Sequence, residues 1–447
     1  MHADLPALTE ALLAAARRAG AEAADAMAVA GTASGIDVRD GRLEQAERSE
    51  GIEVGLRVLI GGRQACVSAS DVSAATLAAM AERAVAMARE APEDPSVGLA
   101  DPAALAQGPF PALDLDDPAP EPDPAVLEAM ARAAEGAARA VPGISRIDQA
   151  SASWGRRAMW LAATNGFAGG YARTSSSLSC VAITGTGTGM ERDWAGEGRV
   201  HLADLPPPEE VGRLAAARTL ARAGARKPPT GRFPVLYDER VAASLIGHLL
   251  SAINGTAVAR GATWARGLLG QAVLPARIDL IEDPHRPRIA GSRPFDAEGL
   301  ATARRTIVAD GVLTGWVLDL ATGRKLGLPS TANATRGTGA PPAPGTSNVE
   351  ITQGTASRDD LIAAMGRGLV VTSMLGAAIN PTTGDYSRGA AGFWVEGGEV
   401  AWPVNECTIA GSLPEMLRRL TPANDARAHL STRVPSLLVE GLTIAGA

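Results

Sequence analysis

Histidine and cysteine are the residue types in this sequence that most directly suggest metal binding or nucleophilic catalysis. The 447-residue chain has five histidines and three cysteines, and the histidines are His2, His201, His248, His285 and His429. No two of these histidines have the spacing of HExxH or HxH, which would place two imidazoles on one metal ion. Spacing alone therefore predicts no metal site.

His248 is the histidine in the most apolar surroundings, because residues 241–250 (VAASLIGHLL) have the pattern of a helix. A single histidine on such a helix is usually a packed, hydrogen-bonded residue. Among the cysteines, Cys407 follows Glu406 but has no histidine near it in the sequence, so a nucleophilic thiol is not indicated. The three cysteines show no CxxC spacing, which favours a reducing compartment over a disulfide framework.

Two glycine-rich segments are candidate ligand loops. Residues 185–189 (GTGTG) follow a strand-like run, but no helix pattern comes next whose N-terminus could meet a phosphate. Residues 384–394 (GDYSRGAAGFW) are the densest cluster of polar residues and glycine, without the GxSxG pattern of a serine nucleophile. Two interpretations stay open for them: a tight turn in which Asp385 and Ser387 satisfy backbone donors, or a loop that lines a cleft.

The elements that must position these residues can be predicted from periodicity and turn signals. Helical periodicity and capping residues predict helices over residues 5–19, 73–90, 125–140, 208–222, 239–254 and 357–366. Alternating apolar residues around two-residue turns predict β-hairpins, with the turns at Gly61-Gly62, Asn165-Gly166, Asp310-Gly311 and Gly397-Gly398. These elements predict an α+β fold with helices flanking an antiparallel sheet in the first half, and a mainly β, barrel-like second half.

Proline marks two interruptions along the chain. Residues 92–124 hold nine prolines and several acids, so we expect an extended surface excursion rather than a folded unit. Residues 227–231 (KPPTG) have the composition of a linker. The sequence therefore predicts two domains, residues 1–226 and 232–447.

Composition excludes several classes of function. The net charge is −7, with 49 acidic and 42 basic residues, so the chain lacks the positive field that non-specific nucleic-acid binding needs. The longest apolar stretch, residues 369–379, is too short to cross a bilayer. The first residues lack the pattern of a signal peptide. We expect a cytoplasmic protein that binds neither nucleic acid nor membrane.

Four longer motifs in one order resemble a known family. They are residues 294–299 (PFDAEG), 324–328 (RKLGL), 384–399 (GDYSRGAAGFWVEGGE) and 403–413 (PVNECTIAGSL). Together they look like the TldD/PmbA family, the "modulator of DNA gyrase" proteins, and most like its PmbA branch, also called TldE. The resemblance implies a cytoplasmic zinc metallopeptidase built from a TldD and a TldE subunit, which trims or degrades peptides.

The sequence departs from the zinc motif that the resemblance implies. The TldD branch carries HExxxH on a helix and a cysteine ligand close to its C-terminus. Here Ala243 stands for the first histidine, Ser244 for the glutamate and His248 for the second histidine, and residues 430–447 contain no cysteine. A catalytic zinc normally needs three protein ligands and an open position, and a general base near the bound water. We therefore expect no metal ligands and no catalytic residue in this chain, and zinc on a partner.

These inferences predict a PmbA/TldE-like subunit that is not catalytic alone and pairs with a TldD-like subunit to act on unfolded or small peptides. Asp385, Ser387 and Arg388 are the candidates for lining the substrate cavity. A sheet edge could hold an extended peptide through main-chain hydrogen bonds. Two alternatives remain open: a homodimeric peptidase with a metal site that the sequence disguises, and a regulator that acts on gyrase or its inhibitors without proteolysis.

Overall fold

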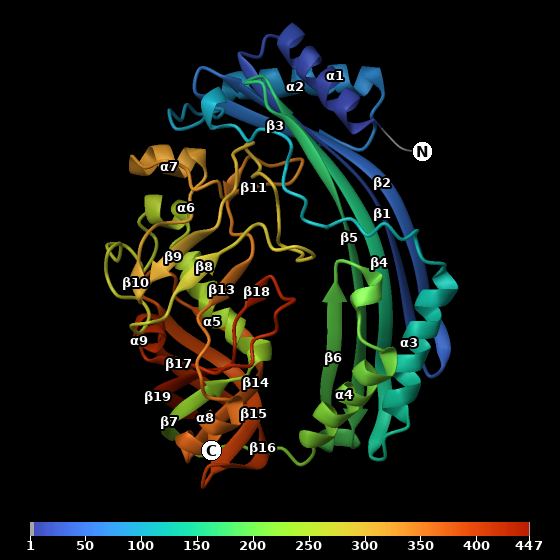
Figure 1. Ribbon diagram of the computed structural model, residues 1–447, viewed down its shortest axis with the longest axis vertical. Coiled ribbons are helices and arrows are strands. Elements are labelled where there is room, and N and C mark those ends of the chain that lie inside the picture. The colour runs from blue at the N-terminus through green and yellow to red at the C-terminus, as the bar shows by residue number, and fades with distance from the viewer. Residues whose placement is uncertain (1–3, 447) are drawn as a thin grey trace.

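The first half of the chain builds one long, curved antiparallel sheet. The computed structural model describes residues 4–446, and Figure 1 shows this sheet running along the right-hand side of the molecule. Its strand order is β3-β2-β1-β4-β5-β6. The strands are β1 (Ala23–Arg39), β2 (Arg42–Ile60), β3 (Arg63–Ala69), β4 (Ile144–Ala163), β5 (Ala168–Thr184) and β6 (Glu191–Arg199).

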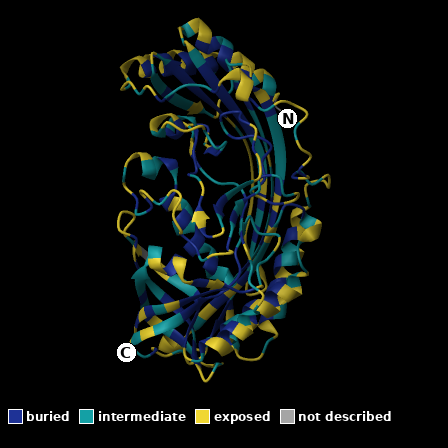
Figure 2. Cartoon of the chain, turned by 60° about the vertical axis from the view of Figure 1, so that its left-hand side comes forward, coloured by how far each residue is buried: buried dark blue, intermediate teal, exposed yellow. Residues whose placement is uncertain are grey.

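Four helices cover one face of this sheet in two pairs. They are α1 (Leu5–Ala19), α2 (Ala74–Glu90), α3 (Pro124–Arg139) and α4 (Pro208–Ala221). Because side chains alternate along a strand, the even-numbered residues of β1 face the helices. Ala24, Ala26 and Ala28 pack in the core with α1 and α2, whereas Ile36 and Val38 pack in a second core with α3 and α4. Figure 2 shows exposed residues along the outer sides of these helices and buried residues along the strands.

The proline-rich segment crosses the molecule between the two pairs of helices. It is extended, as predicted, but it is not a loose excursion, because Leu113 and Leu115 are buried. The amide of Thr174 on β5 donates to the carbonyl of Leu115 (2.8 Å), and the amide of Arg288 donates to the carbonyl of Leu113 (3.0 Å). Most of the segment is exposed or half-buried, so it runs over the surface, and isolated leucines among the prolines pin it to both halves of the chain.

The second half contains a closed β-barrel. Its strands are β7 (Gly231–Tyr237), β14 (Gly368–Ile379), β15 (Asp385–Glu396), β16 (Glu399–Ser412) and β19 (Leu437–Ala445). They follow the order β16-β15-β14-β7-β19, and the pairing of β16 with β19 closes the ring. In the described part of the barrel, β7 and β14 are the one parallel pair. The short strand β17 (Leu420–Pro422) adds to β19.

Shorter elements surround the barrel. A second sheet consists of β8 (Leu280–Glu282), β9 (Arg305–Ala309), β10 (Val312–Leu313), β13 (Val349–Ile351) and β18 (Thr432–Arg433), and β11 (Ala334–Thr335) pairs with β12 (Ala343–Pro344). The helices are α5 (Glu239–Ala252), α6 (Gly255–Ala259), α7 (Leu320–Leu326), α8 (Arg358–Met365) and α9 (Leu413–Arg418). Among the described residues, no helix combines the length and apolarity that a bilayer span requires.

The structure confirms the predicted fold class and most predicted elements. The predicted helices correspond to α1–α5 and α8, and the four predicted hairpin turns join β2 to β3, β4 to β5, β9 to β10 and β15 to β16. For residues 384–394, the sequence left open a tight turn or a loop that lines a cleft. The segment is neither, because it forms most of strand β15. The division of the chain into domains at residues 227–231 stays a prediction.

Candidate functional site

The helix α5 carries Ala243, Ser244 and His248 and lies against the barrel. It follows β7 directly, and the Asp238 side chain caps it by accepting a hydrogen bond from the amide of Arg240 (3.3 Å). One face of the helix, with Leu245 and Leu249 at its centre, is buried in the barrel core. The other face is only partly buried and carries Ala243, Ser244 and His248. A Cβ atom placed on Gly247 would meet no atom within 4 Å, so this face looks onto open space.

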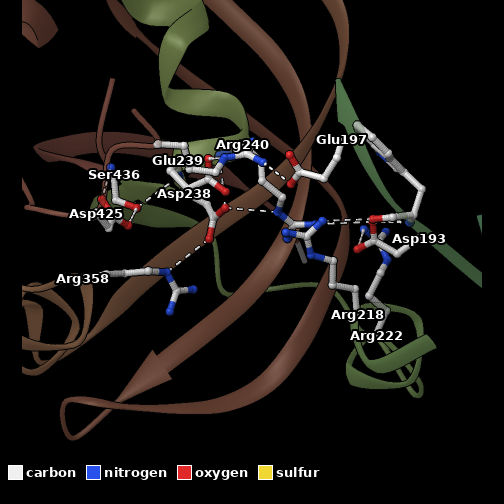
Figure 3. A network of polar contacts seen from close by, with 12 residues as sticks. Asp193, Glu197, Arg218, Arg222, Asp238, Glu239, Arg240, Arg358, Asp425 and Ser436 are labelled. Carbon is white, nitrogen blue, oxygen red and sulfur yellow. Dashed lines mark hydrogen bonds and ion pairs between the residues drawn. The ribbon is translucent and has the colours of Figure 1, made fainter. Parts of the chain in front are cut away.

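A network of ion pairs fixes the N-terminal end of α5 to both halves of the chain. Figure 3 shows its members, Asp193, Glu197, Arg218, Arg222, Asp238, Glu239, Arg240, Arg358, Asp425 and Ser436. Arg240 joins Asp238 of the cap (3.1 Å) to Asp193 on β6 (3.5 Å). Arg427 in turn bridges Glu239 (2.8 Å) and Glu197 on β6 (3.1 Å). The position of α5 is therefore coupled to the edge strand of the first sheet.

His248 is a neutral, partly buried imidazole at the end of the barrel. Its ring lies edge-to-face with the Tyr386 ring, with 6.0 Å between the centroids. Burial lowers the pKa of His248, and the charge of Arg388 lowers it further. Its Nε2 atom is buried and has no hydrogen-bond partner among the described residues. This histidine is packed, as the default interpretation expects, but it is not fully hydrogen-bonded.

The three predicted cavity residues on β15 do not share one face. Side chains alternate along a strand, so Arg388 lies on the same face as Tyr386, next to His248. Asp385 and Ser387 lie on the opposite face, where the Asp385 carboxylate accepts a hydrogen bond from the Thr383 hydroxyl (2.6 Å). The structure therefore brings Arg388 to the α5 helix and leaves Asp385 and Ser387 outside this cluster.

Tyr237 and Tyr386 belong to the same cluster, and sequence reasoning missed them. Tyr237 is the last residue of β7 and is fully buried beside Tyr386, with which its hydroxyl group interacts. Burial and the neighbouring Tyr386 raise its pKa well above the usual value of a phenol. The Tyr386 hydroxyl donates to the sulfur of Met374 on β14 (3.3 Å). The only sequence signal for Tyr237 is its place at the end of a strand, directly before a helix cap.

The side chains on α5 do not fit a zinc ion. Ala243 offers a methyl group, and the Ser244 hydroxyl donates to the carbonyl of Val241 within its own helix (2.7 Å). Arg388 is the charged group that lowers the pKa of the imidazole, and its positive charge would also repel a divalent metal ion. Across residues 4–446, no group of three or more His, Cys, Asp or Glu side chains could hold a metal ion.

Comparison with known families decides which family this chain belongs to. Three family models match in succession: PmbA/TldA metallopeptidase domain 1 at residues 24–88, its central domain at 117–223 and its C-terminal domain at 230–446. The chain belongs to the PmbA/TldD metallopeptidase family. The family resemblance of the sequence motifs is thereby confirmed.

Individual relatives agree with this assignment. The chain is 37% identical over 416 residues to the "Metalloprotease PmbA" of Escherichia coli O157:H7, covering 93% of this chain and 90% of that protein. A putative modulator of DNA gyrase from Bacteroides thetaiotaomicron VPI-5482 has 27% identity, a TM-score of 0.91 and 100% coverage of both chains. TldE from Thermococcus kodakarensis has 21% identity and a TM-score of 0.85, covering 98% of this chain and 99% of that one, which shows a shared fold.

Proposed function

We propose that this chain is a PmbA/TldE-like subunit that does not cleave peptides alone and completes a cytoplasmic zinc metallopeptidase together with a TldD-like subunit. The observation that carries the proposal is the partly buried face of α5. Where the family resemblance implies zinc ligands, this face presents a methyl group, a serine hydroxyl bonded within its own helix and one imidazole beside a guanidinium. One neutral imidazole does not supply the three ligands that a catalytic zinc requires. Zinc and the general base would come from the partner.

In this proposal, the chain helps to hold an extended peptide next to α5. Strand β14 pairs with β7 only over Leu369–Val371, so residues 372–379 have no strand on that side among the described residues. Leu375, within this free edge, exposes 72% of its surface. An exposed strand edge binds an extended chain through main-chain hydrogen bonds that do not depend on its sequence. Such binding suits a peptidase that acts on unfolded peptides of varied sequence.

The subunit role can be tested by reconstitution. The purified chain, a cognate TldD-like protein and an equimolar mixture would each be incubated with a fluorescently labelled unfolded peptide, and zinc would be measured in each preparation. We expect cleavage by the mixture alone, and no stoichiometric zinc on this chain. Equal cleavage by the TldD-like protein without this chain would contradict the subunit role. Tightly bound zinc and cleavage by this chain alone would instead favour the homodimeric peptidase.

A free-edge variant sharpens the same test. Leu375→Pro would remove a backbone donor within residues 372–379, at a side chain that is 72% exposed, and narrow the edge available to a peptide. Val400→Pro, on an exposed position of the neighbouring hairpin of β15 and β16, introduces the same residue elsewhere in the barrel. We expect the first variant to slow cleavage by the mixture more than the second, at equal thermal stability of the two.

A further inference from the structure

Arg388 is a partly buried cation without a counter-ion. Its Nε atom donates to the carbonyl of Gly376 on β14 (2.8 Å), and no carboxylate among residues 4–446 forms an ion pair with it. Removing a charge from water is costly unless a partner of opposite charge compensates for it. The two terminal nitrogens of its guanidinium therefore remain available to an anion from outside the chain.

A neighbouring group also lacks a partner. Tyr386, two residues before Arg388 on the same face of β15, stacks edge-to-face on His248 (6.0 Å between centroids). The buried Nε2 of His248 has no hydrogen-bond partner among the described residues. Buried polar groups in folded proteins are nearly always hydrogen-bonded, so the unpaired one beside the guanidinium indicates a missing ligand or water.

The cluster is open on the side that faces away from the barrel core. A Cβ atom on Gly247, the residue before His248, would meet no atom within 4 Å. On β14, the residue before Gly376 is Leu375, which is 72% exposed. A ligand can therefore reach the guanidinium without rearrangement of the core.

We propose that Arg388 and His248 form a carboxylate-binding site that takes the C-terminal carboxylate of a peptide. A guanidinium offers two parallel N–H groups that match the two oxygens of a carboxylate. One cation beside a neutral imidazole balances a single negative charge, whereas a phosphate dianion would need a second cation. The terminal carboxylate is favoured over an acidic side chain because Arg388 is bonded to Gly376, within the free edge of β14. The end of a main chain lying along that edge would reach it.

The identity of the ligand as a peptide rests on the proposed function, but the binding test does not require cleavage. Binding of a labelled eight-residue peptide to the isolated full-length chain would be measured by fluorescence anisotropy, with a free C-terminal carboxylate and with a C-terminal amide. A third peptide would combine the amide with an internal glutamate. We expect the free acid to bind about tenfold more tightly than either amide, the typical effect of a charge-assisted pair of hydrogen bonds.

Variants assign the effect to the proposed residues. Arg388→Gln removes the charge and should abolish the preference for the free acid. Arg388→Lys keeps the charge but lacks the two parallel N–H groups of the guanidinium, so it should retain part of this preference. Arg260→Gln removes the same charge from an exposed side chain and should leave the preference intact. Should Arg388→Gln fail to fold, His248→Phe should still reduce the preference, because it removes the imidazole whose buried Nε2 lacks a partner beside the guanidinium.

Three outcomes would overturn the inference: equal binding of acid and amide to the unmodified chain, a preference that persists in a folded Arg388→Gln variant, or an internal glutamate that restores full affinity to the amide. The inference and the proposed function can fail separately. Cleavage by the two-subunit mixture with no acid preference would reject this site and keep the subunit role. Carboxylate-dependent binding to a chain that does not change cleavage by the TldD-like protein would keep this site and reject the subunit role.

Discussion

At the end of the barrel, the imidazole of His248 and the guanidinium of Arg388 share one partly buried place. The sequence alone singles out the imidazole, because the family resemblance places His248, Ala243 and Ser244 at the positions of a zinc motif, an assignment that stays a prediction. The role of Arg388 could be proposed from the sequence only as one of three cavity residues. Its selection over Asp385 and Ser387 depends on the side-chain alternation of a strand of which the sequence predicted only the end, at the Gly397-Gly398 hairpin. For Tyr237, the sequence offers only its place at the end of a strand, since Tyr386 lies far along the chain.

The pairing of these two groups predicts how His248 titrates. Burial is the larger cause of the lowered pKa and Arg388 the second, so Arg388→Gln should raise the pKa of His248 but leave it below the usual value. The measurement is a titration of the imidazole nitrogens by NMR, with His248→Gln used to assign the signal. The matched variant Arg260→Gln removes an exposed charge that does not contribute to the lowered pKa of His248, so it should not move this pKa. An unchanged pKa in Arg388→Gln would show that the guanidinium points away from the ring.

At the scale of elements, helices were predicted well because their signals are local. The capping residues Ser73 and Asp123 and the periodic apolar faces define α2 and α3 without reference to the rest of the chain. Only the end of strand β15 was predicted, at the Gly397-Gly398 hairpin, because the small residues before it serve contacts that lie outside the strand's own sequence. A Cβ atom on Gly392 would lie 1.9 Å from the carbonyl oxygen of Val370 on β14, so the strand needs glycine there and loses the alternating pattern.

The proline-rich segment has an energetic role that its composition did not predict and that can be tested. Leu115 is 5% exposed, and its neighbour Asp116 forms an ion pair with Arg156 on β4 (2.6 Å). Leu115→Ala should lower the free energy of unfolding by about 2–4 kcal/mol, as expected for removing a buried leucine. Unfolding in urea measures this difference. Leu43→Ala, at a position 45% exposed on β2, should change it by less than about 0.5 kcal/mol. Equal losses of unfolding free energy in the two variants would show that Leu115 does not anchor the segment to the rest of the chain.

At the scale of the whole molecule, the two halves are joined by close backbone contact and buried charge. Asp25 on β1 is paired with Arg57 on β2 and with Arg336 from the second half, and all three side chains are buried. Burial alone would raise the pKa of Asp25, but the two arginines lower it. None of these long-range pairings could be predicted from the sequence, because residues 25 and 336 carry no local signal of their contact.

Gly55 on β2 lies directly against the backbone of the second half at Thr338. A Cβ atom there would lie 2.0 Å from the carbonyl oxygen of Thr338, two residues after Arg336. Gly55→Ala should therefore push the loop that carries Arg336 and Thr338 away from the sheet and weaken the Asp25–Arg336 pair. The free energy of unfolding should fall by at least about 2 kcal/mol. Gly51→Ala on the same strand, where a Cβ meets nothing within 4 Å, should leave it unchanged. Combining Gly55→Ala with Arg336→Ala should cost less than the sum of the two single changes, because both break the same contact.

Beside this junction, a buried carboxyl group predicts how the stability of the whole chain depends on pH. Burial raises the pKa of Glu298 to about 8, and the neighbouring Asp296 adds to the shift. The folded state then holds a proton that the unfolded chain releases near pH 4, so the free energy of unfolding should fall as the pH rises from about 4 to 8. One proton contributes a slope of up to about 1.4 kcal/mol per pH unit. Glu298→Gln should remove this slope in urea unfolding between pH 5 and 8, while the exposed Glu53→Gln should not. The Glu298 carboxyl accepts a hydrogen bond from the Leu320 amide at the start of α7 (2.9 Å). Because a glutamine keeps an oxygen that can accept this bond, the Glu298→Gln variant should still fold. A profile that keeps its slope in Glu298→Gln would place the titrating group elsewhere in the junction.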